Sequence, residues 1–208
     1  MTKSIRLTSD LANGPRKFTQ WKRGVRVIGV AESFHRQDKW SNVVAIVMRG
    51  DFRIDGFGYC RPTVGGSDAT DEIISMFKRM KRDDIRFWML GGGIISWFNI
   101  IDNQRLFKKT NIPVICVSYY ESEGIEKYLK EYFPNDWEER ELAINRNGER
   151  TEMQLSDGHL VYLNCTGINE HDALRLVDDF TIDGRVPEPI RVARTTAASI
   201  RRDLLSYR

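Results

Sequence analysis

Three strand-like segments follow one another between Val25 and Cys60, and they constrain the fold more than any other part of the chain. Their sequences are VRVIGVAE, NVVAIVMR and FRIDGFGYC, the first and third alternating and the second a valine-rich apolar run. The turn at 49–51 is short enough for a hairpin, and the linker 33–41 can fold the first segment back on the second. The sequence therefore predicts three antiparallel strands.

The period of the apolar residues changes after residue 67. Ile73, Ile74, Phe77 and Met80 fall on one face of a helix, for which Ser67 is the expected cap and acidic residues fill the first turn. The next expected elements are a strand at 85–90, a short helix ending near Lys108 and Lys109, a strand at 112–119 and a helix at 123–132. This order predicts a mixed α/β sheet.

The last third of the chain carries two hairpin signals, Asn147-Gly148 and Asp157-Gly158, within the alternating residues 140–165. We expect a small antiparallel meander there, followed by a helix at 169–180. A terminal helix is predicted from an apolar stripe, which consists of Ile190, Ala193, Ala197, Ile200 and Leu204. With 208 residues and 41% hydrophobic content, we expect one domain at 24–208, preceded by a basic arm at 1–23.

The strand order predicts where a ligand would bind. A right-handed crossover places the fourth strand beside the first and parallel to it, and sheets of this kind bind ligands in the crevice at the carboxyl ends of such strands. Gly91 is therefore expected to face Ala31 across this crevice. The triplet Gly91-Gly92-Gly93 has neither the GxGxxG spacing of a dinucleotide loop nor the GK[ST] ending of a P-loop, so it predicts a tight strand exit.

Other chemistries find little support in the sequence. Cys60, Cys116 and Cys165 lack the paired spacing of a zinc site and are expected to be reduced, buried thiols. The chain has no GxSxG nucleophile motif. Its longest apolar runs are far below the roughly 20 residues of a membrane span, and its start lacks an export signal. We therefore expect a cytoplasmic protein without a membrane partner.

Five segments, in this order, resemble an uncharacterised family related to endonuclease V, which has the ribonuclease H-like fold. They are RVIGVAESF, TVGGSDATDEII, MLGGGIISWFNIID, IPVICV and GRVPEPIRVA, and the resemblance runs from residue 24 to about residue 200. It implies a ribonuclease H-like mixed sheet of three antiparallel strands followed by βαβ units. In active relatives, clustered acids in the crevice hold Mg²⁺, which activates water for phosphodiester hydrolysis.

The resemblance implies that three of those acids have been lost. Aspartates are expected at the positions that Ala31, Gly65 and Gly91 occupy in this chain. Together with Gly92, these residues would form a degenerate cleft with no metal site. The remaining candidates for relocated ligands are Glu32, His35 and Asp68, although Glu32 should point to the opposite face from Ala31 and Asp68 suits the first turn of a helix.

Positive charge is concentrated at the two ends of the chain. Residues 1–23 carry a net charge of +5 and residues 185–208 carry +4, whereas the whole chain carries +3. If the ends converge, they form a phosphate-attracting patch; the other interpretation is a solvated helix face and a loose arm. The candidate nucleic-acid contacts are Arg16, Lys17, Lys22, Arg23, Arg194 and Arg201. Trp97 and Phe98 suit either core packing or stacking on an unpaired base.

These observations lead to three hypotheses for the function. The first is a non-catalytic endonuclease V-like protein that binds DNA or RNA, with no cofactor. The second is a divergent endonuclease whose Mg²⁺ ligands have moved to Glu32, His35 and Asp68. The third is an interaction protein that forms a homo-oligomer through its terminal helix or a sheet edge.

Overall fold

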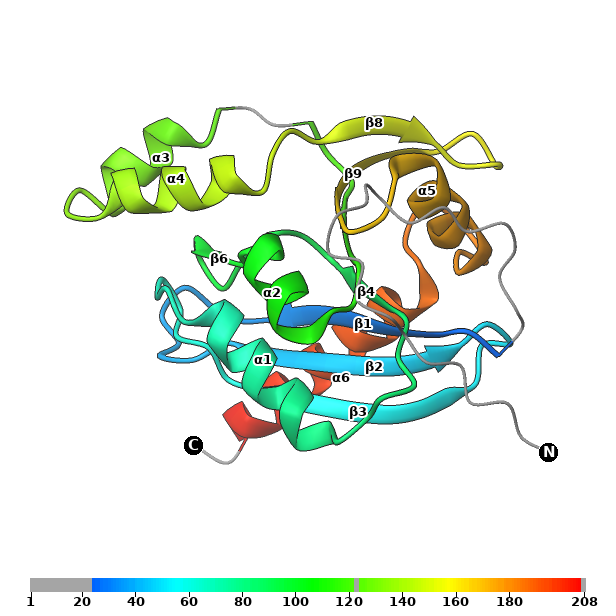
Figure 1. The fold of residues 1–208 in the computed structure, drawn as a ribbon. Coiled ribbons are helices and arrows are strands. Elements are labelled where there is room, and N and C mark those ends of the chain that lie inside the picture. Colours follow the sequence, from blue (N-terminus) through cyan, green and yellow to red (C-terminus); the bar gives the residue numbers. More distant parts are fainter. Residues whose placement is uncertain (1–23, 122–123, 207–208) are drawn as a thin grey trace.

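A seven-stranded mixed sheet forms the centre of the computed structural model, which describes residues 24–121 and 124–206 (Figure 1). The strand order is β3-β2-β1-β4-β7-β9-β8, in which β1, β4 and β7 are parallel neighbours. The strands of this sheet are β1 (Arg26–Ser33), β2 (Asn42–Arg49), β3 (Ile54–Cys60), β4 (Phe87–Leu90), β7 (Val114–Ser118), β8 (Thr151–Gln154) and β9 (Leu160–Thr166). A separate small hairpin is formed by β5 (Ile94–Ile95) and β6 (Asn99–Ile100). The predicted mixed sheet is confirmed, including the antiparallel order of the first three strands.

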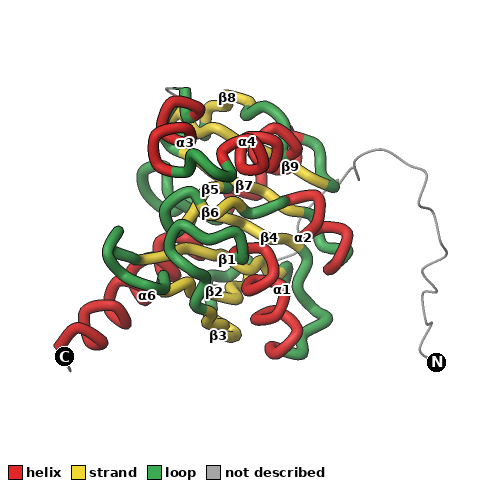
Figure 2. The backbone as a smooth tube through the Cα atoms, turned by 90° about the vertical axis from the view of Figure 1, so that its left-hand side faces the viewer, coloured by secondary structure: helices red, strands yellow, loops and turns green. Residues whose placement is uncertain are grey.

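Helices cover both faces of the sheet and create two cores. Figure 2 shows α6 on one side of β1 and β2, and α1 with α2 on the other. The helices are α1 (Ala69–Met80), α2 (Asn103–Thr110), α3 (Glu126–Tyr132), α4 (Trp137–Arg146), α5 (Glu170–Asp179) and α6 (Glu188–Ser206). One core joins the sheet to α5 and α6, and the other joins it to α1 and α2. Ile190, Ala193 and Ala197 of the predicted α6 stripe are fully buried.

Two glycines allow the first turn of α6 to lie directly on the sheet. A Cβ atom at Gly29 of β1 would lie 2.3 Å from Pro189 Cβ, and one at Gly91 would lie 2.9 Å from Ile190 Cγ2. Real Cβ atoms essentially never approach other atoms closer than 3.0 Å. The missing side chains on β1 and after β4 therefore set how closely α6 packs.

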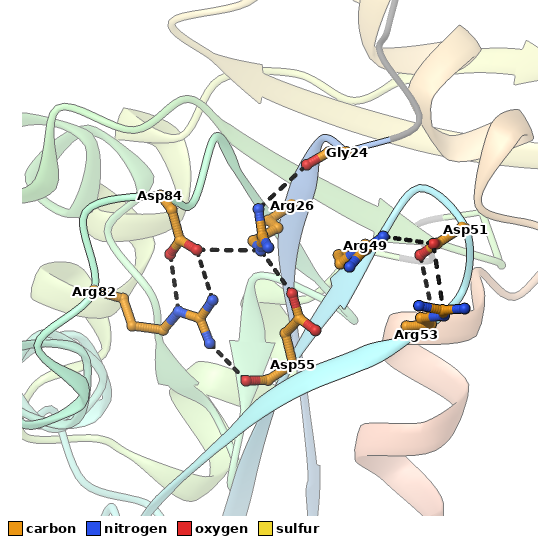
Figure 3. A network of polar contacts seen from close by, with 8 residues as sticks. All are labelled: Gly24, Arg26, Arg49, Asp51, Arg53, Asp55, Arg82 and Asp84. Atoms are coloured by element: carbon orange, nitrogen blue, oxygen red, sulfur yellow. Dashed lines mark hydrogen bonds and ion pairs between the residues drawn. The ribbon is translucent and has the colours of Figure 1, made fainter.

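Arginine side chains bind the backbone of β3, the strand at one edge of the sheet. Arg79 and Arg82 of the α1 region donate to the carbonyls of Tyr59 and Asp55 on β3, at 3.1 and 2.6 Å. Carbonyls satisfied in this way are not available for pairing with another strand, which protects this edge. Figure 3 shows the same network continuing through Arg26, whose Nε lies 2.7 Å from Asp55 and 3.1 Å from Asp84.

The predicted meander is only half right. Residues 137–146 form α4, and Gly148, with φ +81°, follows the end of that helix instead of making a hairpin. The hairpin uses Asp157 and Gly158 and joins β8 to β9. The prediction was wrong in its first half because α4 buries only one residue, Arg140, so it has no apolar stripe by which a helix is recognised.

One further sequence expectation is corrected by the structure, and another lies outside its reach. The residue preceding α1 is Asp68, not Ser67. The basic arm at 1–23 lies outside the described residues, as do its candidate contacts Arg16, Lys17, Lys22 and Arg23. In the part of the chain that is described, no helix is long and apolar enough to cross a bilayer.

Candidate functional site

The carboxyl ends of β1 and β4 meet at one edge of the sheet, where the degenerate cleft was expected. Val30 pairs with Leu90 in the parallel ladder, and the Gly91 amide donates to the Val30 carbonyl at 2.9 Å. A Cβ atom at Gly91 would lie 3.8 Å from the Cβ of Ala31. Side chains at these two positions therefore point to one place, as two aspartates binding one metal ion would require.

An apolar side chain occupies that place. Ile190 of α6 is fully buried and its Cγ2 lies 2.9 Å from the Cβ position of Gly91, while Ala31 is also buried. Mg²⁺ requires oxygen ligands in near-octahedral geometry, and the side chains of Ala31 and Ile190 offer none. Within the described residues, no three His, Cys, Asp or Glu side chains are grouped so that they could hold a metal ion. The residues at this point do not fit the magnesium site that the fold implies.

Glu32, a carboxylate, directly follows Ala31 on β1, and it is enclosed by hydrogen-bond donors. Its Oε2 accepts from the Ser96 amide at 2.6 Å, from the Ser96 hydroxyl at 2.7 Å and from the Ser41 hydroxyl at 3.1 Å. Burial raises the pKa of Glu32 above its ordinary value of 4.5, and the hydrogen bonds from Ser96 and Ser41 offset only part of this rise. Glu32 therefore holds the loop after β4 in place.

The raised pKa of Glu32 predicts a pH-dependent contribution to stability. As pH rises past 4.5, the unfolded state loses this proton before the folded state does, so Glu32 lowers the free energy of unfolding until pH exceeds its folded-state pKa. Glu32→Gln should remove this decline, because an amide does not titrate, while its oxygen still offers an acceptor to the Ser96 amide. Urea unfolding between about pH 4 and about pH 8 measures the difference between the two proteins.

A second variant separates charge from hydrogen bonding at the same position. Glu32→Ala leaves the buried Ser96 amide without its acceptor, and we expect it to lower the free energy of unfolding by about 1–3 kcal/mol. Equal stability of the Ala and Gln variants at every pH would show that the Ser96 hydrogen bonds contribute nothing.

The loop at Gly65, where the third aspartate was expected, is bound by a buried arginine. Arg140 of α4 is 7% exposed, and its guanidinium donates to the carbonyls of Gly65, Gly66 and Phe98 at 2.8, 2.9 and 2.8 Å. Its Nε donates to Asp136 at 2.9 Å. A cation thus lies beside the loop in which a metal-binding acid was expected, and no sequence pattern marks this arginine among the charged residues of α4.

His35 and Asp68 belong to other loops. His35 is exposed, and its backbone amide donates to Asp38 at 2.8 Å. The Asp68 carboxylate accepts from the Thr63 amide at 3.0 Å and from the Asn99 amide group at 2.7 Å. Partial burial acts to raise the pKa of Asp68, but these hydrogen bonds hold it below its ordinary value. Glu32 and Asp68 thus bind different residues of the β5–β6 hairpin, whereas His35 lies in an exposed loop.

Three consecutive residues after β5 adopt the left-handed conformation, with φ +49° at Ser96, +61° at Trp97 and +58° at Phe98. This conformation costs roughly 1–2 kcal/mol for each non-glycine residue and rarely occurs in runs. Glu32 binds the Ser96 amide, the Gly65 amide donates to the Ser96 carbonyl at 2.7 Å, and Arg140 binds the Phe98 carbonyl. Each end of the strained run is therefore held by the surrounding loops.

Arginines from α6 and the loop before it line the same edge. The charge of Arg194 offsets a small part of the rise that burial causes in the pKa of Glu32. The guanidinium of Arg194 lies 5.7 Å from the Tyr119 ring. Arg185 donates to the Tyr119 carbonyl at 2.7 Å, and Arg201 Nε donates to the Ser33 hydroxyl at 3.1 Å. Among the residues that the structure describes, these three arginines form no ion pair. Among the same described residues, the buried Nη1 atom of Arg201 has no hydrogen-bond partner.

Comparisons with known proteins identify the family to which this sequence is similar. The model of a family described as endonuclease dU matches residues 23–201. A UPF0215 protein of Methanosarcina barkeri is 36% identical over 182 residues, which cover 86% of this chain and 92% of that protein. Another, from Pyrobaculum calidifontis, is 34% identical over 175 residues, covering 84% of this chain and 96% of the relative.

Solved structures show the same fold. A protein of unknown function from Archaeoglobus fulgidus, 31% identical, superposes with a TM-score of 0.74 over 85% of this chain and 98% of its own. Endonuclease V from Bacillus subtilis has a TM-score of 0.59 at 11% identity, covering 90% and 84% of the two chains. Endonuclease V from Ciona intestinalis, in complex with a DNA containing an inosine, has a TM-score of 0.58 at 13% identity, covering 88% of each chain. These similarities confirm the predicted ribonuclease H-like fold.

Proposed function

This chain belongs to the endonuclease dU family, and we propose that it is a member that binds nucleic acid without cleaving it through a magnesium site. The observation that carries this proposal is Ile190, which fills the point where Ala31 and Gly91 meet. A site without carboxylates at that point lacks the charge that a divalent cation needs. Hydrolysis by metal-activated water therefore has no support in these residues.

Arg185, Arg194 and Arg201 support the binding half of the proposal. They lie at the edge of the sheet that holds the former cleft, and guanidinium groups are suited to phosphate because they donate in a planar fork. Arg194 and Arg201 are seven residues apart on α6, so they lie two turns apart on one face of the helix. The DNA complex of the Ciona endonuclease V, which has the same fold, makes DNA or RNA the partner we propose.

The salt dependence of binding tests this proposal. We expect labelled DNA and RNA oligonucleotides to bind at low salt, with an affinity that falls as salt rises. The double variant Arg194→Ala, Arg201→Ala should reduce the slope of log affinity against log salt by about 1–2, because each lost phosphate contact contributes about 0.7–0.9. Arg86→Ala is the matched control, since Arg86 is an exposed arginine at the opposite end of β4.

Two outcomes would contradict the proposal. An unchanged slope in the double variant would show that α6 does not contact phosphate. A rise of the melting temperature in Mg²⁺, abolished by Glu32→Ala and accompanied by cleavage of inosine-containing DNA, would favour the relocated-ligand endonuclease instead.

A further inference from the structure

Four aromatic rings form a continuous row beside the former cleft, between the strained run and α3. Trp97 lies 5.1 Å from Tyr132 and 5.2 Å from Phe98, and Phe98 lies 5.7 Å from Phe133, all between ring centroids. An arginine covers each end of the row. The guanidinium of Arg140 lies 3.9 Å from the Phe133 ring, and that of Arg36 lies 4.2 Å from the Trp97 ring.

The arginines at the two ends of the row differ in exposure, whereas all four rings are half-buried. Arg140 is buried and fully hydrogen-bonded, so Phe98 and Phe133 attach α3 and α4 to the loop after β4. Arg36 is exposed, and it lies 4.6 Å from the Tyr132 ring as well as over Trp97. Neither Trp97 nor Tyr132 belongs to either core. The outer half of the row is therefore half-buried beneath the exposed Arg36 and is not part of the packing of either core.

A planar cation already lies on the two outer rings. Arg36 comes from an exposed loop and has no ion-pair partner among the described residues. A guanidinium and a nucleobase are both flat and stack on aromatic faces in the same way. The two rings are tilted by 54° to each other, so a base that replaces Arg36 would stack on the face of one ring and contact the other beside it.

The position of Trp97 depends on the residue that replaced the third acid. A Cβ atom at Gly65 would lie 3.3 Å from Trp97 Cδ1 and 3.4 Å from Phe133 Cε1. The resemblance to active relatives places an aspartate at Gly65, so the loss of that carboxylate also clears the space in which the indole lies. Trp97 keeps this place in spite of a backbone conformation, φ +61°, that disfavours a large side chain.

From these observations we infer that Trp97 and Tyr132 form a stacking platform for one unpaired base of a single-stranded nucleic acid. The inference rests on the proposed function, in which Arg185, Arg194 and Arg201 bind the phosphates. The platform binds a base that displaces the Arg36 side chain. Stacking of this kind depends little on which base is present, since every base has an aromatic face. The platform therefore selects single strands over duplexes, in which the faces of the bases are covered.

An abasic oligonucleotide tests the platform independently of the phosphate contacts. We expect the protein to bind an oligothymidylate about ten-fold more tightly than an oligomer of the same length and charge built from abasic sites. Trp97→Gly should abolish this preference while the salt dependence stays unchanged. Glycine adopts the left-handed conformation at residue 97 without strain, so this variant should remain folded.

The control variant is Trp137→Ala, which removes an indole at the start of α4 that also lies beneath a cation, Lys130 at 4.4 Å. It should keep the full preference for bases. Equal binding of the two oligomers by the unmodified protein, or a preference that survives Trp97→Gly, would overturn the platform while the phosphate site stands. No binding of either oligomer at low salt would overturn both.

Discussion

Gly91→Asp is expected to lower the free energy of unfolding by about 3 kcal/mol, because the aspartate would displace a fully buried side chain. Its Cβ would lie 2.9 Å from Ile190 Cγ2 and 3.3 Å from the Val30 carbonyl oxygen. Ile190 cannot turn away easily, since a β-branched side chain has few rotamers and this one is buried. In a chain of this size, the loss corresponds to a fall in melting temperature of roughly 6 to 12 °C.

Two further variants identify the cause of that loss. Gly91→Asp combined with Ile190→Ala should recover part of the lost stability, because the smaller side chain makes room for the carboxylate. Gly93→Ala should be nearly neutral, since its Cβ would lie 3.4 Å from its nearest neighbour, Cys116 Sγ. If Gly91→Asp melts at the same temperature as the unmodified protein, the meeting point of Ala31 and Gly91 is open and its description as filled is wrong.

Arg140→Ala is expected to have an effect of similar size, about 3 kcal/mol, since hydrogen bonds to a charged group are among the stronger ones in proteins. It would leave three carbonyl oxygens and Asp136 without their donor and uncover the Phe133 ring. The loss should appear as faster amide hydrogen exchange in α3 and α4. These helices otherwise bury only Leu129.

The control for Arg140 lies on the same helix. Arg146 is 60% exposed and 3.9 Å from Asp102, and exposed pairs of this kind contribute about 0–1 kcal/mol. Arg146→Ala should therefore leave exchange in α3 unchanged. Arg140→Lys keeps the charge but loses the planar fork. Its exchange rates in α3 and α4 should therefore lie between those of Arg140→Ala and Arg146→Ala. Equal exchange rates in all three variants would contradict the role given to Arg140.

The sheet could be predicted because its strands are marked by local patterns and its order follows from a general rule. The alternation before Cys60 and the apolar run at Phe87–Leu90 mark strands directly, and the right-handed crossover then makes Ala31 a neighbour of Gly91. No such pattern marks α4, which carries exposed charges around a single buried arginine. A helix of that kind is fixed by its tertiary contacts alone.

The candidate site was predictable only in part, for a related reason. The absence of acids at Ala31 and Gly91 could be read from the sequence. The side chain that fills the space between them, Ile190, could not. Glu32 binds Ser96 across 64 residues and Arg140 binds Gly65 across 75, and no short-range pattern records such partners. The left-handed run at Ser96 was equally hidden, since Trp97 and Phe98 are not residue types that usually adopt it.

The close packing of α6 against Gly29 and Gly91 limits which substitutions the sequence of this protein can accept. A single substitution that reintroduces a carboxylate after β4 meets a side chain almost a hundred positions later in the chain, so it is penalised before it can confer any benefit. Carboxylates at these two positions would need compensating replacements in α6 as well, because Ile190 lies against Gly91. The close packing of this helix on the strands therefore puts a stability cost on any change that brings negative charge to this end of the sheet.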